Sequence, residues 1–453
     1  MTLPVSAFKA YDIRGRVPEE LNQEIAEAIG RAYALHIKPQ KVVVGHDIRI
    51  TSPEITQALI RGLRSAGVSV SNIGECGTEE VYFATNHYGF DGGIVVTASH
   101  NPMRYNGMKL VRAQSRPVSG DTGLQEIRDL VASNQFKDEP AVGKLEQLDH
   151  RPDYISHLLS YIDASKWHKM KIVVNPGNGG AGVVVDALAD NLPIELVKVN
   201  YDPDGHFPNG VPNPLIEKNR HSTIDAIKKS GASLGVAWDG DFDRCFLFDE
   251  SGRFIEGYYV VGLLSKAFLT QTGGGTVIHD PRLIWNTIDV VESAGGRAVM
   301  SKTGHAFIKE RMRAEDAIYG GEMSAHHYFR DFAYCDSGML PWLLVIDLMA
   351  SSGKKLSELV DQMILRFPIS GEINRRIDDP DELLIRLERF YGPEAIHMTH
   401  VDGLSVEYDD WRFNVRTSNT EPVVRLNVET RGDVALMLEK RDELVAHLGG
   451  DPV

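Results

Sequence analysis

Short apolar runs that end in turn residues recur three times along the chain. Lys41–Val44, Lys171–Val174 and Thr276–Ile278 are rich in valine and isoleucine, and a stretch of helical pattern and two further apolar runs follow each of them. Strands that alternate with helices in this way are typical of mixed or parallel sheets covered by helices. The pattern therefore predicts three related α/β domains.

The third strand of each unit runs into a polar loop. The second strands are expected at Val68–Ile73, Ile194–Val199 and Arg297–Met300, and the third strands at Gly93–Val96, Leu234–Ala237 and Ala317–Tyr319. Functional groups of α/β sheets collect in loops beyond the strand ends. We expect the loops that follow, Thr97–Pro102, Asp239–Asp241 and Gly320–Ser324, to face one shared cleft.

The pattern changes after about Phe367. Glu372–Ile377 and Trp411–Arg416 alternate between apolar and polar residues and lie beside helical stretches, which predicts a smaller C-terminal α+β domain. The polar stretch Asp138–Arg151 is a plausible first boundary. We expect domains at residues 1–148, 149–250, 251–366 and 367–453.

Composition narrows the class of protein. The 453 residues are 42% hydrophobic and 25% charged, as in ordinary globular proteins, and a net charge of −15 argues against non-specific binding of nucleic acid. Three cysteines cannot form a disulfide framework, the first residues show no signal-peptide pattern, and the apolar stretch Met339–Ala350 is too short to span a membrane. We expect a soluble cytoplasmic protein.

Three carboxylates stand at alternate positions of one loop. Asp239, Asp241 and Asp243 can point at one centre, and because such close anions repel one another, a hard divalent cation is their natural partner. The calcium-binding EF-hand pattern fails at Arg244, where that loop needs glycine. Mg²⁺ is favoured over Ca²⁺ because it takes few protein ligands and completes its shell with water or phosphate oxygens. The alternative is an acidic surface loop.

Ser99 follows a predicted buried strand, which is a suitable position for a nucleophile or a phosphate carrier. His100 is not expected to act on it, because neighbouring side chains on an extended chain point apart. Lys109 could reach back as an acid, a base or a phosphate contact. A serine in a turn and a solvated lysine are the structural alternatives.

Two further loops carry polar side chains. Arg416–Pro422, with Arg425 beyond it, combines guanidinium, hydroxyl and amide groups that suit a phosphate, although a hairpin turn would look the same. Glu322 and Ser324 could bind sugar hydroxyls. The alternative is a plain turn, in which the two histidines that follow are ordinary surface residues. His305 could titrate near neutral pH.

Gly177–Gly182 matches the glycine pattern of dinucleotide-binding sites and lies between a predicted strand and a predicted helix. Pro176 interrupts the usual context. The alternative is a tight turn whose glycines allow close packing. A P-loop pattern is absent from the sequence.

The order and combination of the four polar loops resemble those of the α-D-phosphohexomutase family. The resemblance runs from Phe8 to Arg425, and Asp239–Phe246 and Gly320–Phe329 look most like its bacterial phosphomannomutase branch. It implies four domains in a heart-shaped arrangement around a central cleft. Two departures are Phe242, where glycine is common, and Arg282, where some dual-specificity relatives have lysine.

The resemblance also implies roles for individual residues. Ser99 would be the phosphoserine and, with Asp239, Asp241 and Asp243, would bind Mg²⁺. The residues near the transferring phosphate and the acid/base step would be Arg14, Lys109, Arg244 and His305. The sugar and the phosphate that is not transferred would be held by Glu322, Ser324, Arg416, Ser418, Asn419, Thr420 and Arg425, with Arg282 as a further substrate-binding candidate.

The implied activity is phosphoryl transfer between mannose 6-phosphate and mannose 1-phosphate through a hexose 1,6-bisphosphate, in GDP-mannose synthesis. The expected partners are small hexose phosphates, and the expected state is a monomer or weak dimer. A phosphoglucomutase or an enzyme of dual specificity is the first alternative. A dinucleotide-dependent oxidoreductase and a non-catalytic sugar-phosphate binding protein remain as alternatives of other classes.

Overall fold

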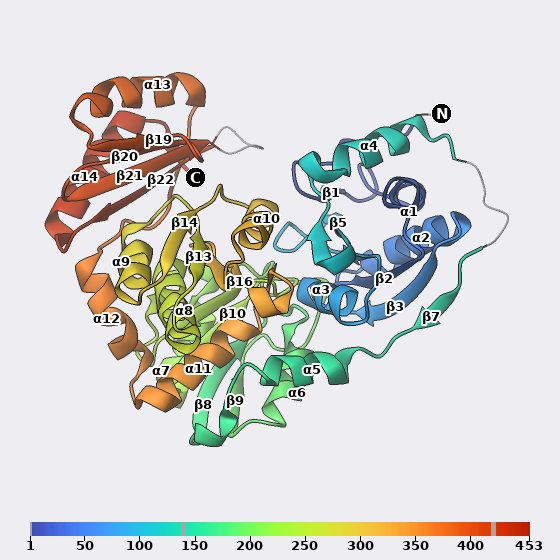
Figure 1. Cartoon of the computed structure of the whole chain (residues 1–453), viewed down its shortest axis with the longest axis horizontal. Helices are drawn as coiled ribbons and strands as arrows, with labels where there is room; N and C mark the ends of the chain where they lie inside the picture. Colours follow the sequence, from blue (N-terminus) through green and yellow to red (C-terminus); the bar gives the residue numbers. More distant parts are fainter. Residues whose placement is uncertain (1, 137–141, 418–422) are drawn as a thin grey trace. The chain divides into compact units, whose positions relative to one another are not determined.

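The computed structural model describes residues 2–136, 142–417 and 423–453, whose strands form four sheets (Figure 1). The first three sheets share a parallel core in which the third strand, the first strand and the second strand lie in that order. These triplets are β4 (Gly92–Val96), β2 (Lys41–His46) and β3 (Ser69–Glu75); β10 (Leu234–Trp238), β8 (Met170–Asn175) and β9 (Ile194–Lys198); and β15 (Tyr319–Gly321), β13 (Thr276–His279) and β14 (Arg297–Met300). The threefold recurrence predicted from the sequence is confirmed.

The first sheet has the order β1-β5-β4-β2-β3-β7, with β6 paired to β5. Its remaining elements are β1 (Ile13–Arg16), β5 (Tyr105–Arg112), β6 (Arg116–Pro117), β7 (Leu145–Gln147), α1 (Gln23–Ile37), α2 (Ser52–Ser65), α3 (Thr78–His87) and α4 (Leu124–Ser133). The stretch expected as a boundary thus contributes an edge strand, since β7 runs parallel to β3.

Alternation along β2 explains how this sheet is covered on both faces. Val42 and Val44 join a core cluster that contains residues of α1 and α2, whereas Val43 joins a second cluster with Val81 and Ala84 of α3. Successive side chains of a strand point to opposite faces, so a continuous run of valines supplies both cores.

The second sheet has the order β12-β11-β10-β8-β9, and the third has the order β14-β13-β15-β16-β17. Their other strands are β11 (Cys245–Phe248), β12 (Phe254–Ile255), β16 (His327–Phe329) and β17 (Cys335–Asp336). The helices of these regions are α5 (Arg151–Leu159), α6 (Ala181–Ala189), α7 (His221–Ser230), α8 (Gly257–Thr272), α9 (Trp285–Ser293), α10 (His305–Glu315), α11 (Leu340–Ser352) and α12 (Leu356–Arg366).

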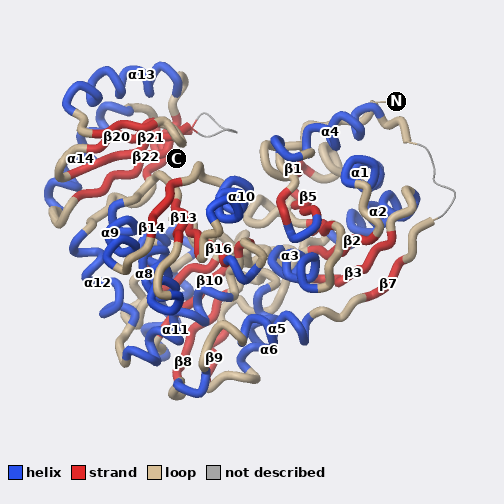
Figure 2. The backbone as a smooth tube through the Cα atoms, viewed as in Figure 1, coloured by secondary structure: helices blue, strands red, loops and turns tan. Residues whose placement is uncertain are grey.

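The C-terminal sheet is antiparallel, with the order β19-β20-β21-β22-β18-β23. Its elements are β18 (Ile373–Arg376), α13 (Pro380–Tyr391), β19 (His397–Thr399), β20 (Leu404–Glu407), β21 (Trp411–Thr417), β22 (Val423–Thr430), α14 (Val434–Leu448) and β23 (Asp451–Pro452). Apolar residues of α13, α14 and the strands form one core cluster. Figure 2 shows both helices beside the strands of this sheet. The predicted fold class, three α/β domains and a smaller C-terminal α+β domain, is confirmed.

The chain divides into two compact units. Unit 1 comprises residues 1–254 and 326–353, and unit 2 comprises residues 255–325 and 354–453. Among the described residues, none of the helices has the length and apolar character needed to cross a membrane.

Candidate active site

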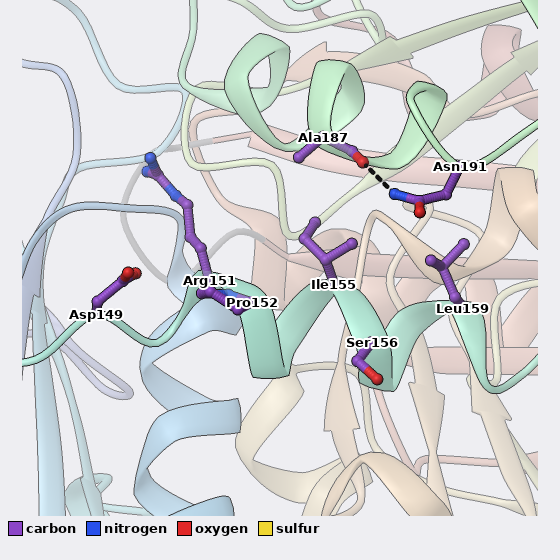
Figure 3. Close-up of a pocket in the computed structure, with 8 residues that line it drawn as sticks. All are labelled: Asp149, Arg151, Pro152, Ile155, Ser156, Leu159, Ala187 and Asn191. Atoms are coloured by element: carbon purple, nitrogen blue, oxygen red, sulfur yellow. Dashed lines mark hydrogen bonds between the residues drawn. The ribbon is translucent and has the colours of Figure 1, made fainter.

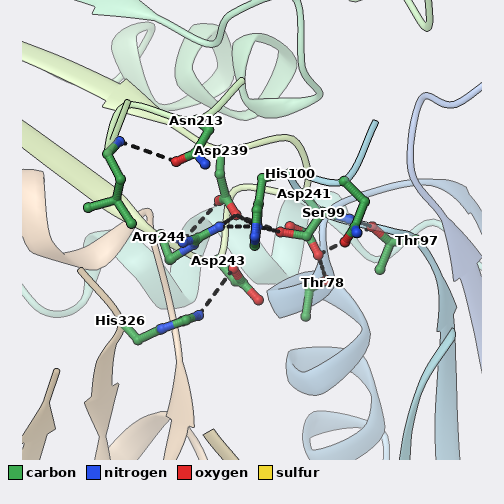
Figure 4. A network of polar contacts seen from close by, with 12 residues as sticks. Thr78, Thr97, Ser99, His100, Asn213, Asp239, Asp241, Asp243, Arg244 and His326 are labelled. Atoms are coloured by element: carbon green, nitrogen blue, oxygen red, sulfur yellow. Dashed lines mark hydrogen bonds and ion pairs between the residues drawn. The ribbon is translucent and has the colours of Figure 1, made fainter. Parts of the chain in front are cut away.

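Ser99 lies in the loop that follows β4, in unit 1, and its backbone adopts a left-handed conformation with φ of 48°. Its hydroxyl group donates a hydrogen bond to Asp239 Oδ2 at 2.7 Å, and its amide N–H donates to Thr97 Oγ1 at 2.9 Å (Figure 4). A non-glycine residue rarely holds this conformation, and such strain is concentrated at functional sites. The loop therefore aims the Ser99 hydroxyl at the carboxylate loop.

His100 corrects the expectation that it points away from Ser99. Its Nδ1 lies 3.0 Å from Ser99 Oγ and also contacts the Arg244 guanidinium. The left-handed turn at Ser99 breaks the alternation that an extended chain would impose. Burial, together with the charges of Arg244 and Arg14, holds the pKa of His100 well below its usual value, so the imidazole is neutral at pH 7.

The carboxylates of Asp239, Asp241 and Asp243 converge after β10. They are almost fully buried, and one oxygen from each lies within 4.8 Å of the others. Within the described part of the chain, Asp241 Oδ1 and Asp243 Oδ1 accept no hydrogen bond. Buried oxygens without a donor are costly, and three hard oxygen ligands suit a hard divalent cation. This donor set fits a divalent metal site.

Phe242 fixes the conformation of the carboxylate loop. Its φ is 46°, and its buried ring fills a slot beside Gly77, where an added Cβ would come within 2.1 Å of the ring. The Phe242 ring therefore packs against Gly77, the residue before α3, and holds the carboxylate loop there.

Two cations offset part of the carboxylate charge. The Lys109 ammonium on β5 pairs with Asp241 at 2.8 Å and also contacts Asp243, while Arg244 Nη2 pairs with Asp239 at 2.8 Å. Burial raises the pKa of Asp239 to about 6, against the effect of Arg244. Burial also acts to raise the pKa of Asp241, but the Lys109 charge and hydrogen bonds from Lys109 and Thr78 bring it well below its usual range.

Arg14 on β1 reaches the same loop system from another side. Its Nε pairs with Asp12 at 2.7 Å, and its Nη1 donates to Asn101 Oδ1 at 2.5 Å. Unit 1 therefore brings together Ser99, Lys109, Arg14, Arg244 and the three aspartates.

Arg49 is a functional candidate that the sequence reasoning missed. Its guanidinium donates to the backbone oxygens of Ser99, Asn101, Pro102 and Tyr105 at 2.6 to 3.0 Å, and it is buried. The only signal for it would have been its internal repeat, because His46-Asp47-Ile48-Arg49 and His279-Asp280-Pro281-Arg282 follow equivalent strands.

The two repeated turns share the same hydrogen bonds. The backbone N–H of Arg49 donates to Asp47 Oδ1, and that of Arg282 donates to Asp280 Oδ1, each at 3.0 Å. In each turn the histidine Nδ1 lies close to the backbone oxygen of the aspartate that follows it, at 2.8 Å in the first turn and 2.9 Å in the second. Two of the related domains therefore use the same turn, with an aspartate bonded to the backbone N–H two residues later, to position an arginine.

His326 is another missed residue, since the sequence suggested an ordinary surface histidine. Its Nε2 lies 3.7 Å from Asp243 Oδ1, and it belongs to unit 1 (Figure 4). Its position after the glycine-led loop was visible in the sequence, but its proximity to the aspartates was not.

Unit 2 gathers arginines around one carboxylate, Glu372, which the sequence reasoning did not single out. Arg416 Nη2 lies 3.3 Å from Glu372 Oε2, Arg282 Nη1 lies 3.6 Å from that oxygen, and Arg425 Nη1 lies 3.6 Å from Glu372 Oε1. Burial acts to raise the pKa of Glu372, but the three arginines bring it below its usual value. The cluster thus combines three guanidinium groups with one shared carboxylate, and Arg282 is in addition paired with Asp280 at 2.7 Å.

Glu322 and Ser324 lie in the same unit as these arginines. Arg282 Nη2 donates to Ser324 Oγ at 3.4 Å and lies 3.8 Å from Glu322 Oε1, and the backbone N–H of Gly304 donates to Glu322 Oε1 at 3.0 Å. His305, the first residue of α10, follows Gly304 directly. Ser418, Asn419 and Thr420 lie outside the described residues.

Family models for the domains of phosphoglucomutase/phosphomannomutase match nearly the whole chain. Domain I matches residues 5–138, domain II residues 152–252, domain III residues 256–367 and the C-terminal domain residues 372–447. A phosphomannomutase of Escherichia coli (strain K12) is 59% identical, with 96% of each chain covered. The chain belongs to the phosphoglucomutase/phosphomannomutase family. It is therefore an isomerase of the mutase type.

Other members of the phosphoglucomutase/phosphomannomutase family agree over the full length. A protein of Xanthomonas campestris pv. campestris (strain B100), described as "Phosphohexose mutases", is 57% identical, with 99% of each chain covered. The crystal structure of a phosphoglucomutase/phosphomannomutase family protein of Burkholderia thailandensis has a TM-score of 0.89 at 32% identity, with 99% of each chain covered.

A hollow of about 580 Å³ lies beside α5 and α6 (Figure 3). Its lining residues are Asp149, Arg151, Pro152, Ile155, Ser156, Leu159, Ala187 and Asn191. None of them belongs to the phosphohexomutase loops, so this hollow is separate from the candidate active site.

Proposed function

We propose that the protein is a phosphomannomutase that interconverts mannose 6-phosphate and mannose 1-phosphate. The observation that carries the proposal is the hydrogen bond of 2.7 Å from Ser99 Oγ to Asp239 inside the buried carboxylate cluster. It joins a nucleophile to a metal-type donor set, as transfer through a phosphoserine requires. Relatives that are 54 to 59% identical are described as phosphomannomutases.

In the proposed reaction, the phosphoryl group leaves the Ser99 oxygen as its phosphorus bonds to the free hydroxyl oxygen of the sugar phosphate. The hydroxyl proton passes to a general base, and the product is a hexose 1,6-bisphosphate. After this intermediate reorients, its other phosphoryl group returns to Ser99, and the isomeric monophosphate is released.

Lys109, Arg14 and Arg244 of unit 1 would position the phosphoryl group during transfer. Their positive charges would offset its negative charge. Asp239, Asp241, Asp243 and the Ser99 phosphate would hold Mg²⁺, which supplies further stabilisation of negative charge when bound. His100 is neutral and its Nδ1 lies 3.0 Å from Ser99 Oγ, so its ring would pack beside that hydroxyl group in the dephosphorylated enzyme.

Unit 2 would bind the part of the substrate that does not react. Arg416 and Arg425, with Ser418, Asn419 and Thr420, would hold the second phosphate, while Glu322 and Ser324 would bind sugar hydroxyls. Arg282 would support this set, and His305 would act in the acid/base step. We further propose that the enzyme works in the cytoplasm as a monomer or weak dimer.

The proposal is tested by turnover of mannose 1-phosphate and glucose 1-phosphate with Mg²⁺ and a catalytic amount of hexose 1,6-bisphosphate. We expect a higher kcat/KM for the mannose compound. Equal values would favour dual specificity, an alternative that the phosphohexose mutase description of one relative supports. Absence of phosphate migration on both sugars would contradict a mutase.

A further inference from the structure

A polar pocket of about 290 Å³ lies at the carboxyl ends of β8 and β10 in unit 1. We call it the asparagine pocket, and its lining comprises Asn175, Gly177, Asn200, Asn209, Gly210, Val211, Pro212, Asn213, Pro214, Lys218, Asn219, His221, Ser222, Ala237 and Trp238. The chain passes from β8 to β9 on one side and then to β10 on the other, so the strand order reverses here. Ligands of open α/β sheets bind at such points.

Side-chain hydrogen bonds hold the walls of the asparagine pocket in place. Asn175 Nδ2 donates to Thr223 Oγ1 at 2.8 Å and to Ser222 Oγ at 3.2 Å, and Asn200 Nδ2 donates to the same Ser222 oxygen at 3.4 Å. Among the described residues, no protein partner satisfies Asn200 Oδ1 or Asn213 Nδ2. The pocket therefore offers both an acceptor and a donor, which matches the two-sided hydrogen bonding of hydroxyl groups.

The charge of the lining favours an anion. The chain carries a net charge of −15, yet none of the lining residues is acidic, and the lining includes Lys218 and His221. His221 and Ser222 are also the first residues of α7, which begins without a side-chain cap, so the positive end of the helix dipole adds to the lysine charge. These features suit a phosphate group beside Lys218 and the start of α7.

The glycine motif at Gly177–Gly182 shapes this pocket. Gly177 has φ of 61°, and a Cβ there would lie 2.8 Å from Pro212 Cβ, so glycine allows the proline segment to close over the end of β8. Asn209 Nδ2 also donates to Asn178 Oδ1 at 2.9 Å. The motif thus brings the 209–214 segment against the strand ends, a role that the mutase reaction does not use.

We propose that the asparagine pocket, which adjoins the carboxylate loop but whose lining includes neither Ser99 nor the three aspartates, is a second binding site for a hexose monophosphate. The amides would bind the sugar hydroxyls, and Lys218 with the start of α7 would bind the phosphate. Trp238 lines the pocket and Asp239 follows it directly, so the bound ligand would contact the strand that carries the carboxylate loop. The assignment follows from the lining and does not depend on the proposed reaction.

The test measures binding of mannose 6-phosphate by calorimetry in the full-length Ser99→Ala protein, where no turnover occurs. We expect two sites. Adding Arg416→Ala and Arg425→Ala should remove the active-site event and leave one site. In that background, Lys218→Glu should weaken the remaining site by about tenfold or more, because it reverses a charge that faces the phosphate.

Lys229→Glu is the matched control, since it makes the same charge change near the other end of α7, outside the pocket. It should leave the affinity unchanged. Inorganic phosphate and unphosphorylated mannose should each compete weakly. A single site in the Ser99→Ala protein, or an affinity that Lys218→Glu does not alter, would overturn the proposal.

A crystal of the wild-type protein soaked in mannose 6-phosphate gives an independent result if the arginine variants do not fold. We expect density for the sugar phosphate between Asn200 and Lys218. Density confined to unit 2 and the Ser99 loop would also overturn the proposal, while leaving the mutase function intact.

Discussion

Arg49 Nη2 donates a hydrogen bond of 2.8 Å to the backbone oxygen of Ser99. The backbone oxygens of Asn101, Pro102 and Tyr105 also accept hydrogen bonds from this guanidinium. Asp47 Oδ2 lies 3.4 Å from Arg49 Nε. The proposed nucleophile is therefore held through its main chain by a buried side chain that does not touch the reacting atoms.

We expect Arg49→Lys to lower kcat by roughly 10- to 100-fold with little change in KM, because one ammonium cannot reach four carbonyls and small misplacements are costly. Steady-state kinetics and thermal unfolding would separate this positioning effect from loss of fold. Arg61→Lys, on the exposed side of α2, is the matched control. An unchanged kcat would show that the loop keeps its geometry without the guanidinium.

Ser99→Ala should lose nearly all mutase activity, on the order of 10⁴-fold or more, as other nucleophile deletions do. Intact mass should show roughly 80 Da of labile phosphate on the wild-type protein after incubation with hexose 1,6-bisphosphate and none on the variant. Ser133→Ala, at the exposed end of α4, should behave like wild type. Near-normal turnover of Ser99→Ala would remove this residue from the reaction.

Removal of divalent metal with EDTA should abolish turnover, and Mg²⁺ should restore it. Asp243→Asn should raise the Mg²⁺ concentration needed for half-maximal activity by at least about tenfold, because it removes a charged oxygen ligand from the cluster. The exposed Asp190→Asn variant provides the comparison. Full activity in EDTA would contradict the metal assignment.

Glu372→Gln should strengthen inhibition by inorganic phosphate, because the wild-type carboxylate already occupies the field of Arg282, Arg416 and Arg425. We expect a fall in Ki of about three- to tenfold, a lower KM and a lower kcat, since tighter binding of the phosphate slows reorientation of the intermediate. Inhibition constants measured at constant ionic strength would test this. Weaker phosphate binding would mean that Glu372 serves mainly to orient the arginines.

Glu79 should make stability depend on pH. Burial raises its pKa to about 8, although Tyr154, Ser337 and two backbone N–H groups donate hydrogen bonds to it. The unfolded chain releases this proton near pH 4.3, so between about pH 5 and pH 8 the folded state binds more protons, and stability falls as pH rises.

The measurement is the difference in Tm between wild type and Glu79→Gln across that pH window. Wild type should lose stability relative to the variant as the pH rises, whereas the exposed Glu126→Gln variant on α4 should track wild type. A difference that stays constant with pH would indicate that Glu79 is ionised throughout the window.

The sequence predicted the strands of the sheet cores well, because runs such as Lys41–Val44 are short, β-branched and followed by turn residues. It did not predict β7, whose residues Leu145–Gln147 are exposed and mostly polar. An edge strand of this kind is defined by its pairing with β3, and a local pattern does not report such pairing.

The polar loops were visible in the sequence because each follows a strand, but the contacts across the fold were not. Glu372 forms an ion pair with Arg282, which lies 90 positions earlier in the chain. Only the tertiary fold brings these two residues together, so no local pattern could indicate the contact. The contact of His100 with Ser99 depends on the left-handed backbone conformation of Ser99. Serine rarely adopts this conformation, so the sequence did not indicate it.

The turn shared by Asp47–Arg49 and Asp280–Arg282 has a consequence for how such a chain can diversify. In each turn the aspartate accepts a hydrogen bond from the backbone N–H two residues later and also lies beside the arginine side chain, at 2.7 Å between Asp280 Oδ2 and Arg282 Nη2 and at 3.4 Å between Asp47 Oδ2 and Arg49 Nε. The other guanidinium nitrogens take their partners from the surrounding loops. After duplication of an α/β unit, one copy could tie down a loop and the other could face a ligand without any rebuilding of the main chain. A new function in such a molecule then requires only different residues around a turn whose backbone conformation is kept.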